Sequence, residues 1–308
     1  MAEAPQFHEV CKISGHKGDV NGAYYLSDLN LCVSIAEDKT IRLWRVKENE
    51  QTFIQLQMHQ TASHPSCLVY NNHDSTFYVG LKSGTILFFS LDMTGTPRLV
   101  PNGDFEPHRN RVTAIAIDNE RHLIISVSRD KYLTVYNYQD GSFSRLYVCS
   151  AWLSCLTFDT DAKIAYCGAY NRNIYSVDIS NETNPVVLAE HEGHRGSIRS
   201  LIFDRVEKRL FSGSFDNTII CWAVNDGLQK GQILMGHQKK IKAMLLLRDN
   251  MLLSTGDDKK FFFFDLDDNT HVECQGISRS NILNLSFHEG YVCSGGCDKI
   301  VHIWKFDL

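Results

Sequence analysis

Short apolar runs alternate with polar turns along the whole chain, and no helical period is sustained. Most runs combine β-branched and aromatic residues and are bounded by Gly, Asp, Asn or Ser, which is typical of strands joined by turns. One run, KKFFFFDLDD at 259–268, holds four consecutive phenylalanines. In a strand, Phe261 and Phe263 face one side of a sheet, and Phe262 and Phe264 face the other. A strand covered on both faces explains such a run, so the pattern predicts an all-β fold with buried inner strands.

A frame of about forty-odd residues repeats along these runs. It consists of a Ser, an Asp four positions later and an aromatic residue six positions after that, as in SIAEDKTIRLW at 34–44. Four further segments keep this frame: SVSRDKYLTVY (126–136), SGSFDNTIICW (212–222), STGDDKKFFFF (254–264) and SGGCDKIVHIW (294–304). Two weaker copies, VGLKSGTILFF (79–89) and CGAYNRNIYSV (167–177), fill the gaps. The seven copies end at positions separated by 45, 47, 41, 45, 42 and 40 residues, namely Trp44, Phe89, Tyr136, Val177, Trp222, Phe264 and Trp304.

A histidine forms a second repeated landmark. A Gly-His or Pro-His pair precedes four of the Asp residues by 21 or 22 positions, at His16, His108, His194 and His237. The frame resembles the WD40 repeat, which implies an all-β propeller of seven four-stranded blades, formed by a single domain over residues 1–308. In such propellers a leading strand completes the last blade. We therefore expect Phe7 to Ile13 to pair with the last repeat and to leave no bare sheet edge.

The recurring Ser, His and Asp residues have the composition of hydrolase triads, but four triads in one chain are too many for one active site. The WD40 resemblance implies instead that they form, with the aromatic residue, a hydrogen-bonded network inside each blade, because buried polar groups need partners. Phe264 cannot donate such a bond, so the sixth network is expected to be truncated, and the seventh repeat lacks the histidine. The expected network residues are His16, Ser34, Asp38, Trp44, His108, Ser126, Asp130, Tyr136, His194, Ser212, Asp216, Trp222, His237, Ser254, Asp258, Ser294, Asp298 and Trp304.

Composition narrows the range of functions. The formal net charge of −5 disfavours a nucleic-acid binder, and the chain shows neither a signal peptide nor an apolar run long enough for a membrane helix. We therefore expect a cytoplasmic protein without membrane insertion. The ten cysteines form no C-x-x-C pair, so reduced thiols are expected, with no metal site and no cofactor. No catalytic motif appears outside the repeated frame, which predicts that the protein is not an enzyme.

Side chains at the rim of the propeller are the remaining candidates for function. The WD40 resemblance implies that ligands meet the start of each first strand and the residue before each turn Asp. In the third, fifth and sixth repeats these positions are basic, with aromatic residues available as anchors. Arg and aromatic residues favour interface hot spots, so we predict a face that binds an acidic or phosphorylated peptide; solvated rim charges are the alternative. The predicted binding residues are Arg111, Arg129, Tyr170, Arg199, Phe215, Lys240 and Lys242.

The irregular repeats carry a narrower resemblance. MHQTASHPSCLVYNNHDSTFYVGLKSGTI (58–86), PHRNRVTAI (107–115) and SAWLSCLTFDTDAKIAYCGAYNRNI (150–174) are similar to repeats of the WD-repeat and FYVE domain-containing proteins. That family implies an endosomal adaptor, but the span between Phe264 and Cys293 holds no zinc-bearing FYVE insert, so lipid reading and zinc do not carry over. We expect a protein-interaction scaffold in endosomal or vesicle traffic, as a monomer or one subunit of a complex. The alternative is a propeller that touches phosphoinositides through the Gly- and Pro-rich segment at 91–105.

Overall fold

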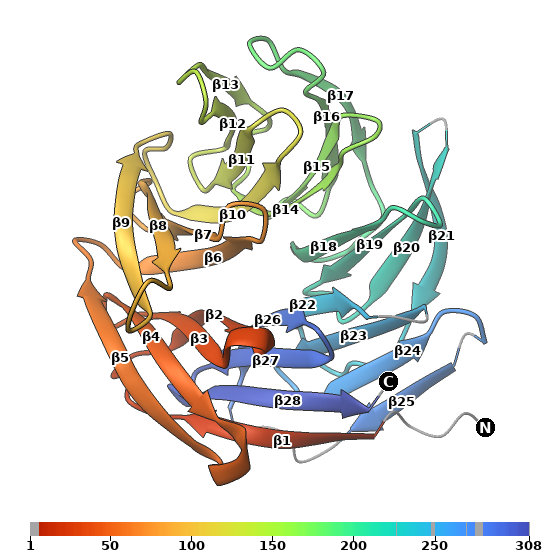
Figure 1. Ribbon diagram of the computed structural model, residues 1–308. Helices are drawn as coiled ribbons and strands as arrows, with labels where there is room; N and C mark the ends of the chain where they lie inside the picture. The colour runs from red at the N-terminus through yellow and green to blue at the C-terminus, as the bar shows by residue number, and fades with distance from the viewer. Residues whose placement is uncertain (1–5, 226, 248–249, 269, 275–279, 308) are drawn as a thin grey trace.

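Seven four-stranded antiparallel sheets stand around a common centre in the computed structural model (Figure 1), which describes residues 6–225, 227–247, 250–268, 270–274 and 280–307. Apart from two short 3-10 turns, η1 (Ser27–Leu29) and η2 (Glu48–Glu50), the regular structure of these residues is all strand. The predicted all-β, seven-bladed propeller is confirmed.

Each of the first six blades is built from four consecutive strands. Blades one to three comprise β2 (Val20–Leu26), β3 (Leu31–Ala36), β4 (Thr40–Lys47) and β5 (Thr52–Gln60); β6 (Pro65–Asn71), β7 (Thr76–Leu81), β8 (Ile86–Asp92) and β9 (Arg98–Phe105); β10 (Val112–Asp118), β11 (Leu123–Ser128), β12 (Tyr132–Asn137) and β13 (Phe143–Tyr147). Blades four to six comprise β14 (Leu153–Asp159), β15 (Ile164–Ala169), β16 (Ile174–Asp178) and β17 (Val186–His191); β18 (Ile198–Asp204), β19 (Arg209–Ser214), β20 (Ile219–Asn225) and β21 (Gly227–Leu234); β22 (Ile241–Leu246), β23 (Met251–Gly256), β24 (Phe261–Asp265) and β25 (Thr270–Cys274).

Blade seven closes the ring with both ends of the chain. It contains β26 (Ile282–His288), β27 (Tyr291–Gly296), β28 (Val301–Asp307) and, as its outer strand, β1 (Gln6–Ile13), which pairs antiparallel with β28. Phe7 stacks on Phe306 at 5.2 Å between ring centroids and lies 5.5 Å from Phe263 of blade six. The predicted closure by the leading strand is therefore confirmed.

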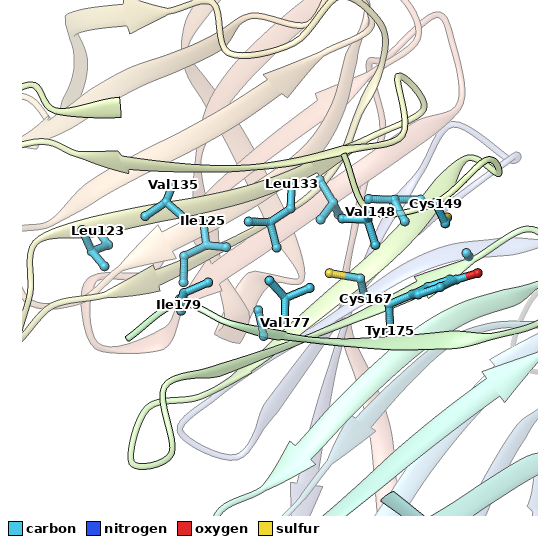
Figure 2. Packing of buried hydrophobic residues seen from close by; sticks show 14 residues of the cluster. Leu123, Ile125, Leu133, Val135, Val148, Cys149, Cys167, Tyr175, Val177 and Ile179 are labelled. Carbon is cyan, nitrogen blue, oxygen red and sulfur yellow. The ribbon is translucent and has the colours of Figure 1, made fainter. Parts of the chain in front are cut away.

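The core lies between neighbouring blades, whose sheets pack face to face. Figure 2 shows one such layer, in which Leu133 and Val135 of blade three meet Cys167 and Val177 of blade four. The four phenylalanines of β24 are at most 2% exposed. The first and third pack in a cluster with Trp304 of blade seven, and the second and fourth pack with blade five. The predicted two-sided burial of this run is confirmed.

The turns between the second and third strands share one backbone conformation. In each blade the residue after the turn Asp, or its equivalent, has a positive φ, from 62° at Lys39 to 107° at Gly84. The turn aspartates favour this geometry because they accept a hydrogen bond from the backbone two residues later, as Asp38 does from Thr40 N at 3.1 Å. Gly84 is required in blade two, since a Cβ there would lie 2.1 Å from the carbonyl oxygen of His108.

The segment at 91–105, named above as the alternative site of phosphoinositide contact, is mostly strand. Strand β8 continues to Asp92 and β9 begins at Arg98, so only a short turn projects between them. Asp92 and Arg98 form an ion pair of 2.8 Å across its base. Among the described residues no helix is both long and apolar enough to cross a membrane.

Candidate functional site at the centre of the ring

A β-bulge opens the first, innermost strand of every blade. In all seven blades the pairing register shifts right after the first residue of this strand, and one residue is left unpaired. A bulge bends its strand and redirects the side chain of the extra residue. Here all seven redirected side chains line one hollow of about 260 Å³ at the centre of the ring: Asn21, Ser66, Thr113, Ser154, Arg199, Lys242 and Leu283.

Short and long side chains in this ring behave differently. In blades one to four the short polar side chain bonds a carbonyl oxygen of the next blade, as Ser154 Oγ does at 2.5 Å to Ile198 O. These bonds link neighbouring blades and engage the polar groups of the four side chains. In blades five and six Arg199 and Lys242 occupy the same position, and their charges reach into the hollow. Arg199 and Lys242 therefore supply part of the positive charge of the hollow, which Arg111 and Arg129 also line.

A second ring surrounds the first and consists of the residues before the seven turn positions. Each donates a hydrogen bond from its backbone N–H to the carbonyl oxygen of the residue that precedes the inner strand of the same blade, at 2.8–3.0 Å. Because this bond recurs in every blade, the seven side chains are held at fixed places on the face of the ring. They are Glu37, Lys82, Arg129, Tyr170, Phe215, Asp257 and Cys297.

Two arginine side chains contact Tyr170. Arg129 Nη2 and Arg199 Nη1 each donate to the Tyr170 hydroxyl at 3.3 Å, and both guanidinium groups lie within 6 Å of its ring centroid. The Nε atoms of both arginines are buried without a hydrogen-bond partner, and within the described residues neither side chain has a carboxylate partner. Two adjacent guanidinium groups thus share the hydroxyl of Tyr170 and not a carboxylate, which leaves their charge uncompensated.

Phe215 extends this cluster towards blade six. Arg199 lies 5.8 Å from its ring centroid, and Lys240 and Lys242 each lie 4.8 Å from it. Aromatic faces attract cations, so Phe215 holds three of them over one ring. Lys242 also forms an ion pair of 3.4 Å with Asp257, whereas Lys240 is exposed.

Glu37 compensates the opposite side of the hollow. It contacts Lys82 at 2.5 Å, Arg111 at 3.1 Å and the side chain of Asn21 at 2.9 Å. Burial opposes ionisation of Glu37, but these contacts outweigh it and hold the pKa of this carboxyl below its usual value. Arg111 differs from the other arginines in having this carboxylate. Burial and, after it, the positive charge of Arg129 nonetheless lower the pKa of Arg111, as expected for neighbouring cations.

The structure thus brings all seven predicted binding residues into one contiguous cluster, which we call the cationic cluster. Trp152 belongs beside it and was missed: its side chain is 44% exposed, Arg129 lies 5.1 Å from its ring, and it meets Tyr170 edge-on at 5.4 Å. The signal was present, because Trp152 precedes the inner strand of blade four as Arg111 and Lys240 precede theirs.

The polar networks inside the blades lie apart from the cationic cluster. In blade one, Trp44 Nε1 donates to Ser34 Oγ at 2.7 Å, Ser34 bonds His16 Nε2 at 2.7 Å, and His16 Nδ1 lies 3.0 Å from Asp38. Blade five repeats this chain of bonds through Trp222, Ser212, His194 and Asp216, at 2.7–2.9 Å. The histidine side chains of blades one, three, five and six are at most 1% exposed. Buried rings of this kind have no surface for a substrate.

Two networks, in blades three and seven, differ from the expected pattern. In blade three the prediction for Tyr136 is wrong: its ring stacks on Phe105 at 4.1 Å, and Thr134 bonds Ser126 at 2.7 Å in its place. In blade six Ser254 and Asp258 bond His237, each at 2.7 Å, and Phe264 adds no bond, as expected.

In blade seven an unpredicted histidine joins the network. His302 Nε2 bonds Asp298 at 3.1 Å, and its Nδ1 bonds Glu9 of the closing strand. Trp304 Nε1 donates to Ser294 at 3.1 Å, so this blade keeps the expected tryptophan bond.

Comparison with known proteins agrees with this architecture. Three segments, 7–45, 99–137 and 186–223, match the family described as "WD domain, G-beta repeat". These three segments are WD40 repeats. Each matched segment begins on the outer strand of one blade and continues into the first three strands of the next blade. The first segment therefore begins on β1, which is the outer strand of blade seven of this WD40 propeller.

Several curated proteins are similar to this WD40 propeller. Mouse WD repeat and FYVE domain-containing protein 1 is 27% identical over 84% of this chain and 62% of its own length. The bovine protein 1 is 29% identical over 73% of this chain, and the human protein 2 is 28% identical over 71%, each over 54% of its own length. The propeller therefore spans between about half and two thirds of the curated relatives it matches.

Proposed function

We propose that the protein is a non-catalytic interaction scaffold whose central hollow binds an acidic or phosphorylated segment of a partner protein. One observation carries this proposal: Arg129 and Arg199 converge on Tyr170 with buried, unpaired Nε atoms and without a carboxylate partner in the described structure. An arginine fork matches the planar carboxylate and the phosphate group with two parallel hydrogen bonds. A bound anion would relieve the repulsion among the arginines and pair their free donors.

The surroundings support recognition by a protein segment. The exposed ring of Trp152 lies against Arg129 and offers apolar contact area next to the anion site. Trp, Tyr and Arg dominate the binding energy of protein interfaces. Glu37 on the far side of the hollow sets a limit, because an acidic ligand lying across it would be repelled. We infer that the anionic group of the partner lies on the side of blades three to six.

The likeness to the WD repeat and FYVE domain-containing proteins supports a cytoplasmic adaptor in endosomal or vesicle traffic. Direct phosphoinositide contact through 91–105 is not favoured, because this segment is mostly strand and Asp92 already pairs Arg98. In the described residues no group of three His, Cys, Asp or Glu side chains is arranged to hold a metal ion.

An affinity selection from peptide libraries tests this function. One library carries a fixed phosphoserine, one a fixed glutamate and one a fixed serine, with the flanking positions random. We expect the immobilised propeller to enrich the phosphoserine and glutamate libraries over the serine library. Replacing both arginines, Arg129→Gln with Arg199→Gln, should weaken binding of the selected peptides at least about tenfold, because each lost charge-assisted bond contributes about 1.5–3 kcal/mol.

A charge-matched control separates the site from the net charge of the protein. Arg172→Gln with Arg205→Gln removes two positive charges from exposed positions outside the cationic cluster and should leave binding unchanged. The proposal is wrong if the propeller shows no preference for the acidic libraries, or if the Arg129 and Arg199 double variant binds the selected peptides as tightly as this control.

A further inference from the structure

Blade two lacks the polar network and holds a groove where the network lies in blade one. The positions of Ser34, Asp38 and Trp44 are taken by Val79, Ser83 and Phe89. A threonine, Thr61, stands four residues before the inner strand, where blade one has His16. These smaller side chains leave a groove of about 520 Å³ between the outer part of blade one and blade two. Leu81, Leu87 and Phe89 form its apolar lining.

Two other blades show what fills the equivalent space. In blade one the Arg42 guanidinium bonds Asp38 at 3.3 Å, lies 5.7 Å from the Trp44 ring, and the residue is only 8% exposed. In blade three Arg145 bonds Asp130 at 2.9 Å and lies 3.8 Å from the ring of Tyr132. In both blades an arginine of the chain itself places its guanidinium group over an aromatic ring and bonds a carboxylate.

In blade two, a leucine and an aspartate occupy the two positions at which blades one and three carry an arginine. Leu87 occupies the position of Arg42 in the repeated frame, and Asp104 lies directly opposite Leu87 in the sheet. Arg145 holds the equivalent outer-strand position in blade three, directly opposite Thr134. Asp104 and Glu106 both line the groove and are exposed, and neither forms an ion pair within the described residues. The groove therefore has carboxylates and an apolar lining but no arginine of its own.

We propose that this groove binds an arginine side chain of a partner protein. The aliphatic stem packs against Leu87 and Phe89, and the guanidinium group bonds Asp104 and Glu106. A guanidinium is favoured over an ammonium because its planar fork serves two carboxylates at once. The site is separate from the cationic cluster and opposite in charge, so it stands independently of the proposed function.

Blocked single amino acids test the site without knowledge of the partner. N-acetyl-arginine methylamide is titrated into isotope-labelled protein while backbone amide signals are followed by NMR. We expect saturating shifts confined to 83–89 and 104–106. N-acetyl-lysine methylamide should bind more weakly, and N-acetyl-norleucine methylamide, which keeps the apolar stem without the charge, should produce no saturating shifts.

Two variants assign the binding to the named side chains. Asp104→Asn with Glu106→Gln should weaken arginine binding at least about tenfold, because two charge-assisted bonds are lost. Leu87→Arg restores the residue type found in blade one and should block the groove from within. Glu192→Gln with Glu207→Gln removes two exposed carboxylates elsewhere and should change nothing.

Several results would overturn the proposal: no saturating shifts with the arginine probe, equal shifts with the norleucine probe, or unchanged binding in the Asp104 and Glu106 double variant. Lysine binding as tight as arginine would overturn the assignment to a guanidinium. Signals outside the groove that match the wild-type spectrum show that each variant is folded, so that loss of binding reports on the groove alone.

Discussion

At the scale of single residues, His302 shows how position changes the charge of a histidine. Burial lowers the pKa of His302, but the hydrogen bonds and charges of Asp298 and Glu9 outweigh it and raise the pKa to about 8. His16 has one carboxylate and a nearby arginine, and burial keeps the pKa of His16 below its usual value. His16 therefore acts as a neutral link in its network, whereas His302 is a cation between two strands that close the ring.

The stability of the propeller should therefore fall as the pH rises from 6.5 to 9. A group whose pKa is raised on folding contributes fully below its unfolded pKa of about 6.5, and the contribution is lost as the pH passes the folded value of about 8. The loss should be on the order of 1–2 kcal/mol in the free energy of unfolding. Urea denaturation at several pH values measures it.

His302→Gln is the control for this pH dependence, because glutamine can replace hydrogen bonds but not the charge. The variant should be less stable at pH 6 and show a flatter profile between pH 6.5 and 9. Cys67 and Cys155 also lower the stability near pH 9, because burial raises the pKa of each folded thiol to about 12 while an unfolded thiol titrates at about 8.5. This loss is common to the wild type and the variant, so the difference between their profiles reports on His302. An unchanged slope in the variant would assign the pH dependence to other groups.

At the scale of the blade, the networks predict unequal costs for one substitution. Ser34 and Ser254 are both fully buried, but Ser34 bonds the indole of Trp44 as well as a histidine, whereas Ser254 bonds His237. Each buried group left without a partner costs about 1–3 kcal/mol. Ser34→Ala should therefore lower the free energy of unfolding by about 2–4 kcal/mol and Ser254→Ala by about 1–2 kcal/mol. Equal losses, measured by urea denaturation, would contradict this account.

The elements of the blade were largely predictable, because each is dictated by a local pattern. The β24 phenylalanines had to be buried on both faces, and the turn aspartates fix their own turns. The bulges were not predictable. Every inner strand has one unpaired residue, so the spacing between repeats gives no sign of it. Thr134 and His302 were missed for another reason: a hydrogen-bonding role depends on which side chain reaches the site, and the frame gives only the position.

At the scale of the whole molecule, stability depends on joining the two ends of the chain. Phe7 of β1 contacts Trp304 and Phe306 of its own blade and Phe261 and Phe263 of blade six. The closing strand therefore completes a sheet and also seals the layer between two blades. Sheet edges left open are prone to pair with other chains. Loss of this strand should affect both stability and aggregation.

Phe7→Ala tests the closure without removing the strand. The substitution leaves the backbone pairs of β1 and β28 but opens a cavity among four aromatic rings, so the free energy of unfolding should fall by about 2–3 kcal/mol. Phe143→Ala on outer strand β13 is the matched control, because Phe143 is 46% exposed and should cost less than about 1 kcal/mol. If the two variants lose equal stability, the aromatic contacts of β1 do not hold the ring closed. If Phe7→Ala alone also increases light scattering on mild heating, opening begins at this blade and exposes the edge of β28.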